Sequence, residues 1–138
     1  MELPLKGGCN CRAVRYECDA EPELILNCHC RDCQHLAGAP CTTAVLVPED
    51  KLHIEGELSC YSVAGDSGGV VHRFFCPKCG TPVAVKPEVF EGLKAVKASS
   101  LDENSWVRPA IDIFVKSKQP WIELSGSTQK FMTLPPAE

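Results

Sequence analysis

Residues 9–11 read Cys9-Asn10-Cys11, and residues 76–80 read Cys76-Pro77-Lys78-Cys79-Gly80. On an extended segment, alternate side chains share a face, so both sulfurs of the first motif can point at one ion. The second motif is a tight turn, and a glycine after its second cysteine tolerates the left-handed backbone that such turns often need. Four thiolates from two paired motifs are typical of structural zinc. The spacing therefore predicts one closed zinc site that joins the first strands to the middle of the chain.

A separate motif, Cys28-His29-Cys30-Arg31-Asp32-Cys33, places three more cysteines within six residues. Three sulfurs at this spacing can converge on one ion, and an open fourth position is what distinguishes catalytic zinc from structural zinc. The alternative is a closed site completed by a more distant side chain. The candidates for that fourth ligand are Cys18, Cys41, Cys60, His35 and Cys79. Spacing leaves both possibilities open.

The ligand set of this second cluster constrains its chemistry. Three thiolates around Zn²⁺ carry a formal charge of −1, which makes the ion a weaker Lewis acid and a poorer source of hydroxide than a site of neutral histidines. Coordination deprotonates thiols, so activation of an incoming thiol is favoured over activation of water. Arg31 either offsets the negative charge or is a solvated surface residue. On an extended segment, His29 points away from its two cysteine neighbours and serves packing or supports the ligands.

Composition bounds the class of protein. The chain has 138 residues, ten cysteines and a formal net charge of −4. Without a basic stripe or a long apolar run, nucleic acid and membranes are not expected partners. The N-terminus has no secretory signal, so we expect a cytoplasmic protein whose cysteines bind metal and do not form disulfides. We predict one domain over residues 1–134 and a loose C-terminal end at 135–138.

Short β-branched and aromatic runs separated by glycine and proline predict a mainly β fold with little helix. A period of two or a buried strand composition predicts strands at 13–17, 42–47, 70–75, 93–98 and 111–115. Residues 31–36 have a weak helical pattern, which Gly38 and Pro40 would end. No internal repeat is visible.

The ordered motifs resemble a known family across nearly the whole chain. They are Gly7-Gly8-Cys9-Asn10-Cys11 with Val14-Arg15-Tyr16, Cys28-His29-Cys30-Arg31-Asp32-Cys33 with Gly38-Ala39-Pro40, and Phe75-Cys76-Pro77-Lys78-Cys79-Gly80, supported by Tyr61-Ser62, Ala98-Ser99-Ser100-Leu101-Asp102 and Ser117-Lys118-Gln119-Pro120-Trp121. This pattern is similar to the glutathione-dependent formaldehyde-activating enzyme and centromere protein V family.

The resemblance implies a β-tent-like fold of short antiparallel sheets with two zinc ions. It implies a structural zinc at Cys9, Cys11, Cys76 and Cys79, and a catalytic zinc at Cys28, Cys30 and Cys33. The implied activity is that of a carbon–sulfur lyase, which joins glutathione or a similar small thiol to formaldehyde or another carbonyl compound. Ser62, Ser67 and Arg31 are candidate donors to the carboxylates of such a thiol.

The sequence departs from the family pattern at a few positions. Arg12 stands where a glycine commonly follows the first motif, and Asp112 where histidine is frequent. Cys41 and Ala44 replace aromatic residues, which implies a differently shaped pocket. Two other functions remain in competition with the enzyme: a non-catalytic zinc scaffold or interaction module, and a redox switch in which Cys28, Cys30 and Cys33 form disulfides after metal loss.

Overall fold

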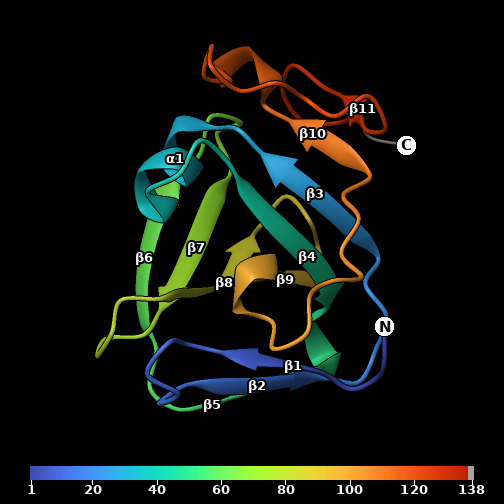
Figure 1. The fold of residues 1–138 in the computed structure, drawn as a ribbon. Helices are drawn as coiled ribbons and strands as arrows, with labels where there is room; N and C mark the ends of the chain where they lie inside the picture. The colour runs from blue at the N-terminus through green and yellow to red at the C-terminus, as the bar shows by residue number, and fades with distance from the viewer. Residues whose placement is uncertain (137–138) are drawn as a thin grey trace.

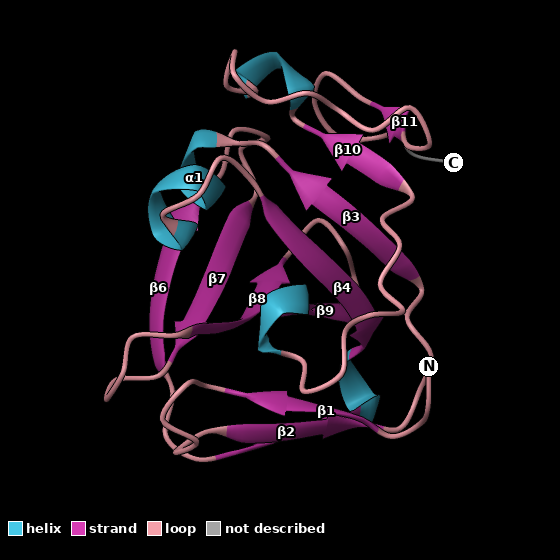
Figure 2. Ribbon diagram, in the orientation of Figure 1, coloured by secondary structure: helices cyan, strands magenta, loops and turns pink. Residues whose placement is uncertain are grey.

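A computed structural model describes residues 1–136 and forms two β-sheets with one short helix (Figures 1 and 2). The small sheet has the strand order β1-β2-β5 and closes the base of the molecule in Figure 1. The large sheet has the order β11-β10-β3-β4-β9-β8-β7-β6 and rises above it, with β7 and β4 leaning toward each other. The strands are β1 (Leu5–Gly8), β2 (Arg15–Cys18), β3 (Leu24–Cys28), β4 (Thr42–Pro48), β5 (Leu52–Glu55), β6 (Ser59–Ala64), β7 (Val70–Phe75), β8 (Pro82–Pro87), β9 (Leu93–Lys97), β10 (Ile111–Ile113) and β11 (Gln129–Lys130).

The single α-helix, α1 (Arg31–Ala37), follows the three-cysteine motif directly, and three 3-10 turns complete the regular structure. Gly38 ends α1 in the left-handed conformation at φ 64°, and its N–H donates to the carbonyl of Gln34. None of the helices in residues 1–136 is long and apolar enough to cross a membrane. The 3-10 turns are η1 (Glu49–Lys51), η2 (Ala98–Ser100) and η3 (Val115–Ser117).

The mainly β class is confirmed, and each of the five strands predicted from sequence overlaps an observed strand. The helix predicted over 31–36 is also present, as α1. The sequence pattern did not predict β1, β3, β5, β6, β8 and β11. These strands are short or lack clear alternation, and β8 begins at Pro82 and ends at Pro87, which a sequence pattern reads as turn residues. Residues 137–138 of the predicted loose end lie outside the described part of the chain.

Most strand pairs are antiparallel, as expected, but the chain also makes two parallel pairings at one edge of the large sheet. Strand β10 runs parallel to both β3 and β11, with Ile113 opposite Cys28. A long connection from β9 carries the chain across the tent before β10 adds beside β3 (Figure 1). As a result, the C-terminal third of the chain is hydrogen-bonded to the strand that leads into the three-cysteine motif.

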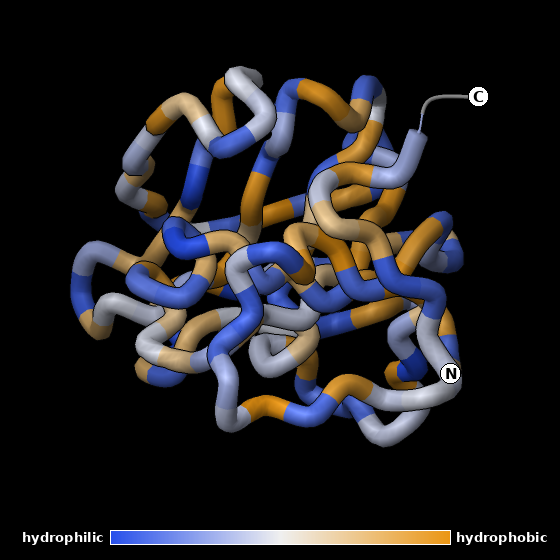
Figure 3. Tube along the Cα trace, turned by 90° about the horizontal axis from the view of Figure 1, so that it is seen from above, coloured by the Kyte–Doolittle hydropathy of each residue, from blue (hydrophilic) through white to orange (hydrophobic). Residues whose placement is uncertain are grey.

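The large sheet separates two hydrophobic cores. Along β4, Val45 and Val47 pack into the core shared with the small sheet, whereas Leu46 packs into the second core. This alternation follows from the period of two along a strand. Figure 3 shows hydrophobic stretches, in orange, interleaved along the chain with hydrophilic stretches, in blue. Cys9 and Cys76 belong to the first core, and Cys28, Cys30 and Cys33 belong to the second. The two cysteine clusters are therefore built into two different cores.

Candidate metal centres and pocket

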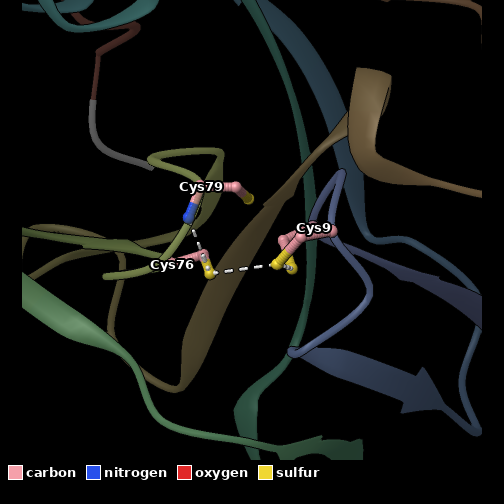
Figure 4. A group of neighbouring side chains, drawn as sticks. Cys9, Cys76 and Cys79 are labelled. Carbon is pink, nitrogen blue, oxygen red and sulfur yellow. Dashed lines mark hydrogen bonds between the residues drawn. The ribbon is translucent and has the colours of Figure 1, made fainter.

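The first cluster brings together the four cysteines of the two paired motifs, from positions 65 residues or more apart. All four sulfur atoms lie within 4.8 Å of one another. Cys9 and Cys76 are buried, whereas Cys11 and Cys79 are exposed. Figure 4 shows Cys9 on its loop facing the turn that carries Cys76 and Cys79. Gly80 has φ 79°, the left-handed backbone expected after this motif.

The geometry of this cluster fits a tetrahedral zinc ion. With Zn–S bonds near 2.3 Å, the sulfurs of such a site lie about 3.8 Å apart. The Cys9–Cys11 and Cys11–Cys76 sulfur pairs are 3.5 and 3.8 Å apart. Backbone N–H groups also donate to the sulfurs, as from Val14 to Cys9 at 3.2 Å and from Cys79 to Cys76 at 3.4 Å. Donors that point at sulfur stabilise thiolates, so the loops are shaped for anionic ligands.

One ligand of this cluster is held ready as a thiolate. The hydroxyl of Thr81 lies 3.1 Å from Cys79 Sγ and is the largest influence that lowers the pKa of Cys79 to about 5. Deprotonated cysteine is the form that binds metal. The donor set, the sulfur spacing and the hydrogen bonds therefore all fit a structural zinc ion.

The second cluster consists of Cys28, Cys30 and Cys33, whose sulfur atoms also lie within 4.8 Å of one another. Cys28 ends β3, Cys30 caps the N-terminus of α1, and Cys33 lies in its first turn. Cys30 Sγ accepts a hydrogen bond from the Cys33 N–H at 3.3 Å. All three side chains are buried, at 7–8% exposure. The compact turn between β3 and α1 thus gathers three soft ligands that suit zinc.

None of the candidates for a fourth ligand joins this group within residues 1–136. Cys79 belongs to the first cluster, and Cys18 is buried in the other core. Cys60 and His35 are exposed, on β6 and on α1. Of the candidate cysteines, Cys41 lies nearest along the chain, but it is outside the set of mutually close sulfurs. Within the described residues, the cluster therefore offers three sulfur ligands, and none of the candidates supplies a fourth.

Two buried cations lie beside the three sulfurs. Arg73 of β7 directs Nη1 at Cys33 Sγ over 3.6 Å, and Lys97 lies at the end of β9. Both side chains are only 8% exposed. Hydrogen bonds with Cys28 and Cys30, together with these two positive charges, lower the pKa of Cys33 in spite of its burial. Burial lowers the pKa of Lys97, and the charge of Cys33 opposes that effect.

A small, mainly apolar pocket of about 90 Å³ opens onto the three sulfurs. Its walls come from the strands of the second core, from the loop after β6 and from the C-terminal segment, and include Leu46, Val71, Phe90 and Phe114. Ala44 is also in this wall. The pocket is large enough for a sulfur atom with its first carbons, or for a small carbonyl compound, but not for a whole peptide.

A much larger polar hollow of about 960 Å³ shares Thr42 and Lys97 with the small pocket. Hydroxyl and amide side chains line it, together with Arg12 and Arg15. Its volume falls at the upper end of the range of small-molecule sites. The hollow therefore has room for the polar body of a ligand whose reactive end occupies the smaller pocket.

His29 holds the turn that carries the three cysteines against strand β10. This side chain is 1% exposed, and its Nε2 lies 2.7 Å from Asp112 Oδ1 on β10. Burial alone would raise the pKa of Asp112, but hydrogen bonds from Thr128 and His29 outweigh it, so the pKa is lowered. Gln34 adds a second brace by donating to the carbonyls of His29 and Ser117. His29 thus points away from the three sulfurs, as the alternation along the motif predicts.

The three residues predicted to bind substrate lie in three different places. Ser67 lines the small pocket. The Ser62 hydroxyl is 2.7 Å from His72 Nδ1 on the exposed part of β6, outside both hollows. Arg31 donates to Gln34 at 2.6 Å and faces a separate surface hollow with Trp121.

Sequence analysis missed Arg73 and Lys97 as members of the site. The available signal was Arg73 in the strand-like run 70–75, and the two lysines Lys94 and Lys97 in the strand-like run 93–98. A long cation inside a buried strand needs a nearby counter-charge. The sequence did not show which of the ten cysteines would supply it.

The fold and the two clusters define a class of small, mainly β proteins with two cysteine clusters that could hold metal ions, one of four sulfurs and one of three. The family model for the glutathione-dependent formaldehyde-activating enzyme matches residues 4–117, so the chain belongs to that family. A Podospora anserina protein described as a putative glutathione-dependent formaldehyde-activating enzyme is 31% identical over 114 residues. That match covers 79% of this chain and 53% of the relative, so the chain spans about half the relative's length.

A solved structure supports the fold independently. The crystal structure of a Rhodobacter sphaeroides protein superposes with a TM-score of 0.55 at 21% sequence identity. The superposition covers 75% of this chain and 91% of the other. At this identity the likeness concerns the arrangement of strands alone.

Proposed function

We propose that the protein is a zinc-dependent carbon–sulfur lyase that joins glutathione, or a similar small thiol, to formaldehyde or another small carbonyl compound. The observation that carries the proposal is the buried three-cysteine cluster, which faces a pocket and has no fourth ligand from residues 1–136. Family membership supports the substrate class, since the family is described by glutathione and formaldehyde. We also propose that the protein acts in the cytoplasm, where reduced thiols are available.

The proposed reaction forms one bond and moves one proton. The thiol sulfur attacks the carbonyl carbon, the carbon–oxygen double bond becomes a single bond, and the thiol proton ends on the oxygen. Zinc at Cys28, Cys30 and Cys33 would favour the anionic, nucleophilic form of an incoming thiol. Both reactants must then be held close together, which the small pocket does by confining them beside the three sulfurs.

The chain's own side chains have distinct tasks in this proposal. Apolar walls around the small pocket exclude water, which would otherwise hydrate the aldehyde and the thiolate. The polar hollow takes the peptide-like body and the carboxylates of glutathione, with Arg12 and Arg15 as charged partners. Ser67 lies where it can donate to the oxygen of a small carbonyl compound in the pocket.

The test is the rate of adduct formation by zinc-loaded protein. NMR exchange spectroscopy of glutathione with formaldehyde measures formation of S-hydroxymethylglutathione against the spontaneous background. We expect acceleration by the wild-type protein and by Cys60→Ser, which alters an exposed cysteine outside both clusters. Cys30→Ser should return the rate to background.

A different outcome would favour a scaffold. If X-ray absorption shows both zinc ions bound by four protein sulfurs, and the wild-type rate equals the background rate, the proposed activity is wrong.

A further inference from the structure

Two cations are buried next to the three-cysteine cluster without the partners that buried cations normally have. Within residues 1–136, Arg73 Nε has no hydrogen-bond partner, and the guanidinium's contact is with Cys33 Sγ at 3.6 Å. The Lys97 side chain makes no hydrogen bond or salt bridge within that part of the chain, although its Nζ is not as fully shielded from solvent as Arg73 Nε. Both side chains are more than nine-tenths buried and line the small pocket. Such groups are costly unless something compensates their charge.

The three cysteines compensate only part of that charge. Three thiolates around a divalent ion leave a formal charge of −1, whereas Arg73 and Lys97 together bring +2. Asp66 also lines the pocket, but it is exposed, so solvent screens its negative charge. The buried groups therefore keep an excess positive charge in an apolar setting, where charge interactions are strong. An anion that enters next to the three sulfurs neutralises the excess, whereas water or a neutral carbonyl compound leaves it uncompensated.

We propose that Arg73 and Lys97 are specificity-determining residues that make this pocket select the anionic form of a small thiol over water. The inference rests on the proposed function and deepens it, because it assigns the choice of the first ligand to two residues outside the cysteine motifs. Arg73 acts at the sulfur itself, since its guanidinium lies against Cys33. Lys97 acts from the wall that the pocket shares with the polar hollow.

The alternative role for Arg73 is to bind a carboxylate of the substrate, as the fork of a guanidinium often does. The position of Arg73 in the structure argues against this carboxylate-binding role. Arg73 lies at the small pocket of about 90 Å³, where the sulfur and its first carbons fit, and at a mainly apolar hollow of about 260 Å³. It does not line the polar hollow. The carboxylates of glutathione are several bonds away from its sulfur. Two probes separate the roles: glutathione, and 2-mercaptoethanol, which has no carboxylate.

The experiment measures thiol binding in cobalt-loaded protein, independently of turnover. Cobalt in both clusters gives sulfur-to-metal charge-transfer absorption, and a thiolate that binds at the three-cysteine site increases it. We expect Arg73→Gln and Lys97→Gln to weaken binding of both probes at least about tenfold. Arg73→Lys, which keeps the charge, should recover much of the loss.

The matched control is Lys94→Gln, on the same strand as Lys97. Lys94 lies over the ring of Phe74, 4.4 Å from its centroid, and lines neither hollow. The Lys94→Gln variant should bind glutathione and 2-mercaptoethanol with the same affinity as the wild type. The cobalt spectrum before thiol addition checks that each variant keeps both metal centres. If one of the glutamine variants loses a metal centre, the affinities of the other glutamine variant and of Arg73→Lys test the proposal.

Three results would overturn the proposal. One is equal affinity of all metal-loaded variants for 2-mercaptoethanol. Another is a loss confined to glutathione, which would assign the cations to carboxylate binding. In both cases catalysis by the wild type can persist, so the proposed function survives. The third is the absence of any thiol-dependent absorption in the wild type, which would overturn the proposed function as well.

Discussion

The hydroxyl oxygen of Tyr16 lies 2.6 Å from Ser100 Oγ, across 84 residues of chain. Ser100 donates its own hydrogen to the Lys97 carbonyl at 2.7 Å, so Tyr16 is the donor in the first bond. Tyr16 is 2% exposed and its burial raises its pKa. This bond ties the small sheet to the turn that follows Lys97, and so connects the base of the tent to a wall of the proposed site.

Replacing Tyr16 with phenylalanine should lower the free energy of unfolding by about 1 kcal/mol, because a buried hydrogen bond is lost while the ring still fills its place. Urea denaturation of the metal-loaded protein measures the change. Tyr61→Phe is the control, since Tyr61 is 50% exposed on β6. Equal stability of both variants would show that the Tyr16 bond contributes nothing.

Replacing Arg12 with glycine should stabilise the protein by roughly 0.5–1 kcal/mol. Arg12 has φ 69°, a left-handed conformation that costs a residue with a side chain more than it costs glycine. The left-handed backbone thus gives a physical reason for a glycine at this position, which the family resemblance implies. Thermal unfolding measures the gain. Arg12→Ala removes the same charge but keeps the strain, so an equal gain from alanine would assign the effect to charge.

Replacing Cys76 with serine should remove one zinc ion per chain and lower the stability by several kcal/mol, since binding of a structural ion contributes to folding. Cys76 is fully buried in the first core and contacts Cys11 Sγ at 3.8 Å. Elemental analysis measures the number of zinc ions per chain, and thermal unfolding with and without a chelator measures the loss of stability. Cys60→Ser should retain both ions. A Cys76 variant that still binds two ions would contradict the assignment of this cluster.

The Arg15–Asp102 ion pair should give a pH-dependent contribution to stability. Arg15 Nη1 donates to Asp102 Oδ1 at 3.0 Å, and the hydrogen bond lowers the carboxyl pKa below its ordinary value of 3.8. A carboxyl group whose pKa is lower in the folded state than in the unfolded state stabilises the protein when the pH is above the unfolded-state pKa. That stabilisation is lost as the pH falls through the folded-state pKa. Asp102 is 44% exposed in its side chain, so solvent limits the contribution to at most about 1 kcal/mol.

Urea denaturation of the wild type and of Asp102→Asn should therefore differ at pH 6 and converge as the pH falls below about 3.8. Salt should narrow the gap at pH 6, because the pair is partly exposed. A gap that grows toward acidic pH would contradict the direction of the pKa change.

The cysteine spacing predicted more about this protein than its strand pattern did. Cys76 and Cys79 lie on one turn, and Cys28, Cys30 and Cys33 lie on another, so local geometry alone brings their sulfurs together. The pairing of residues 9–11 with the turn at 76–80 is distant in sequence, and it was predicted because a closed zinc site needs four ligands. The short strands β1, β5 and β6 carry no comparable local signal, since their pairing depends on neighbours elsewhere in the sheets.

The sequence by itself thus determined the mainly β class, the family and the two groups of sulfurs, because each follows from residues close together or from ligand number. Only the tertiary structure decided that Ser67, and not Ser62 or Arg31, lines the pocket, and that Arg73 and Lys97 lie beside Cys33. It also decided that Asp112 supports His29 through a parallel pairing of β10 with β3. These relationships join strands far apart in sequence, and their geometry is set by how the large sheet curves and packs, which no local pattern encodes.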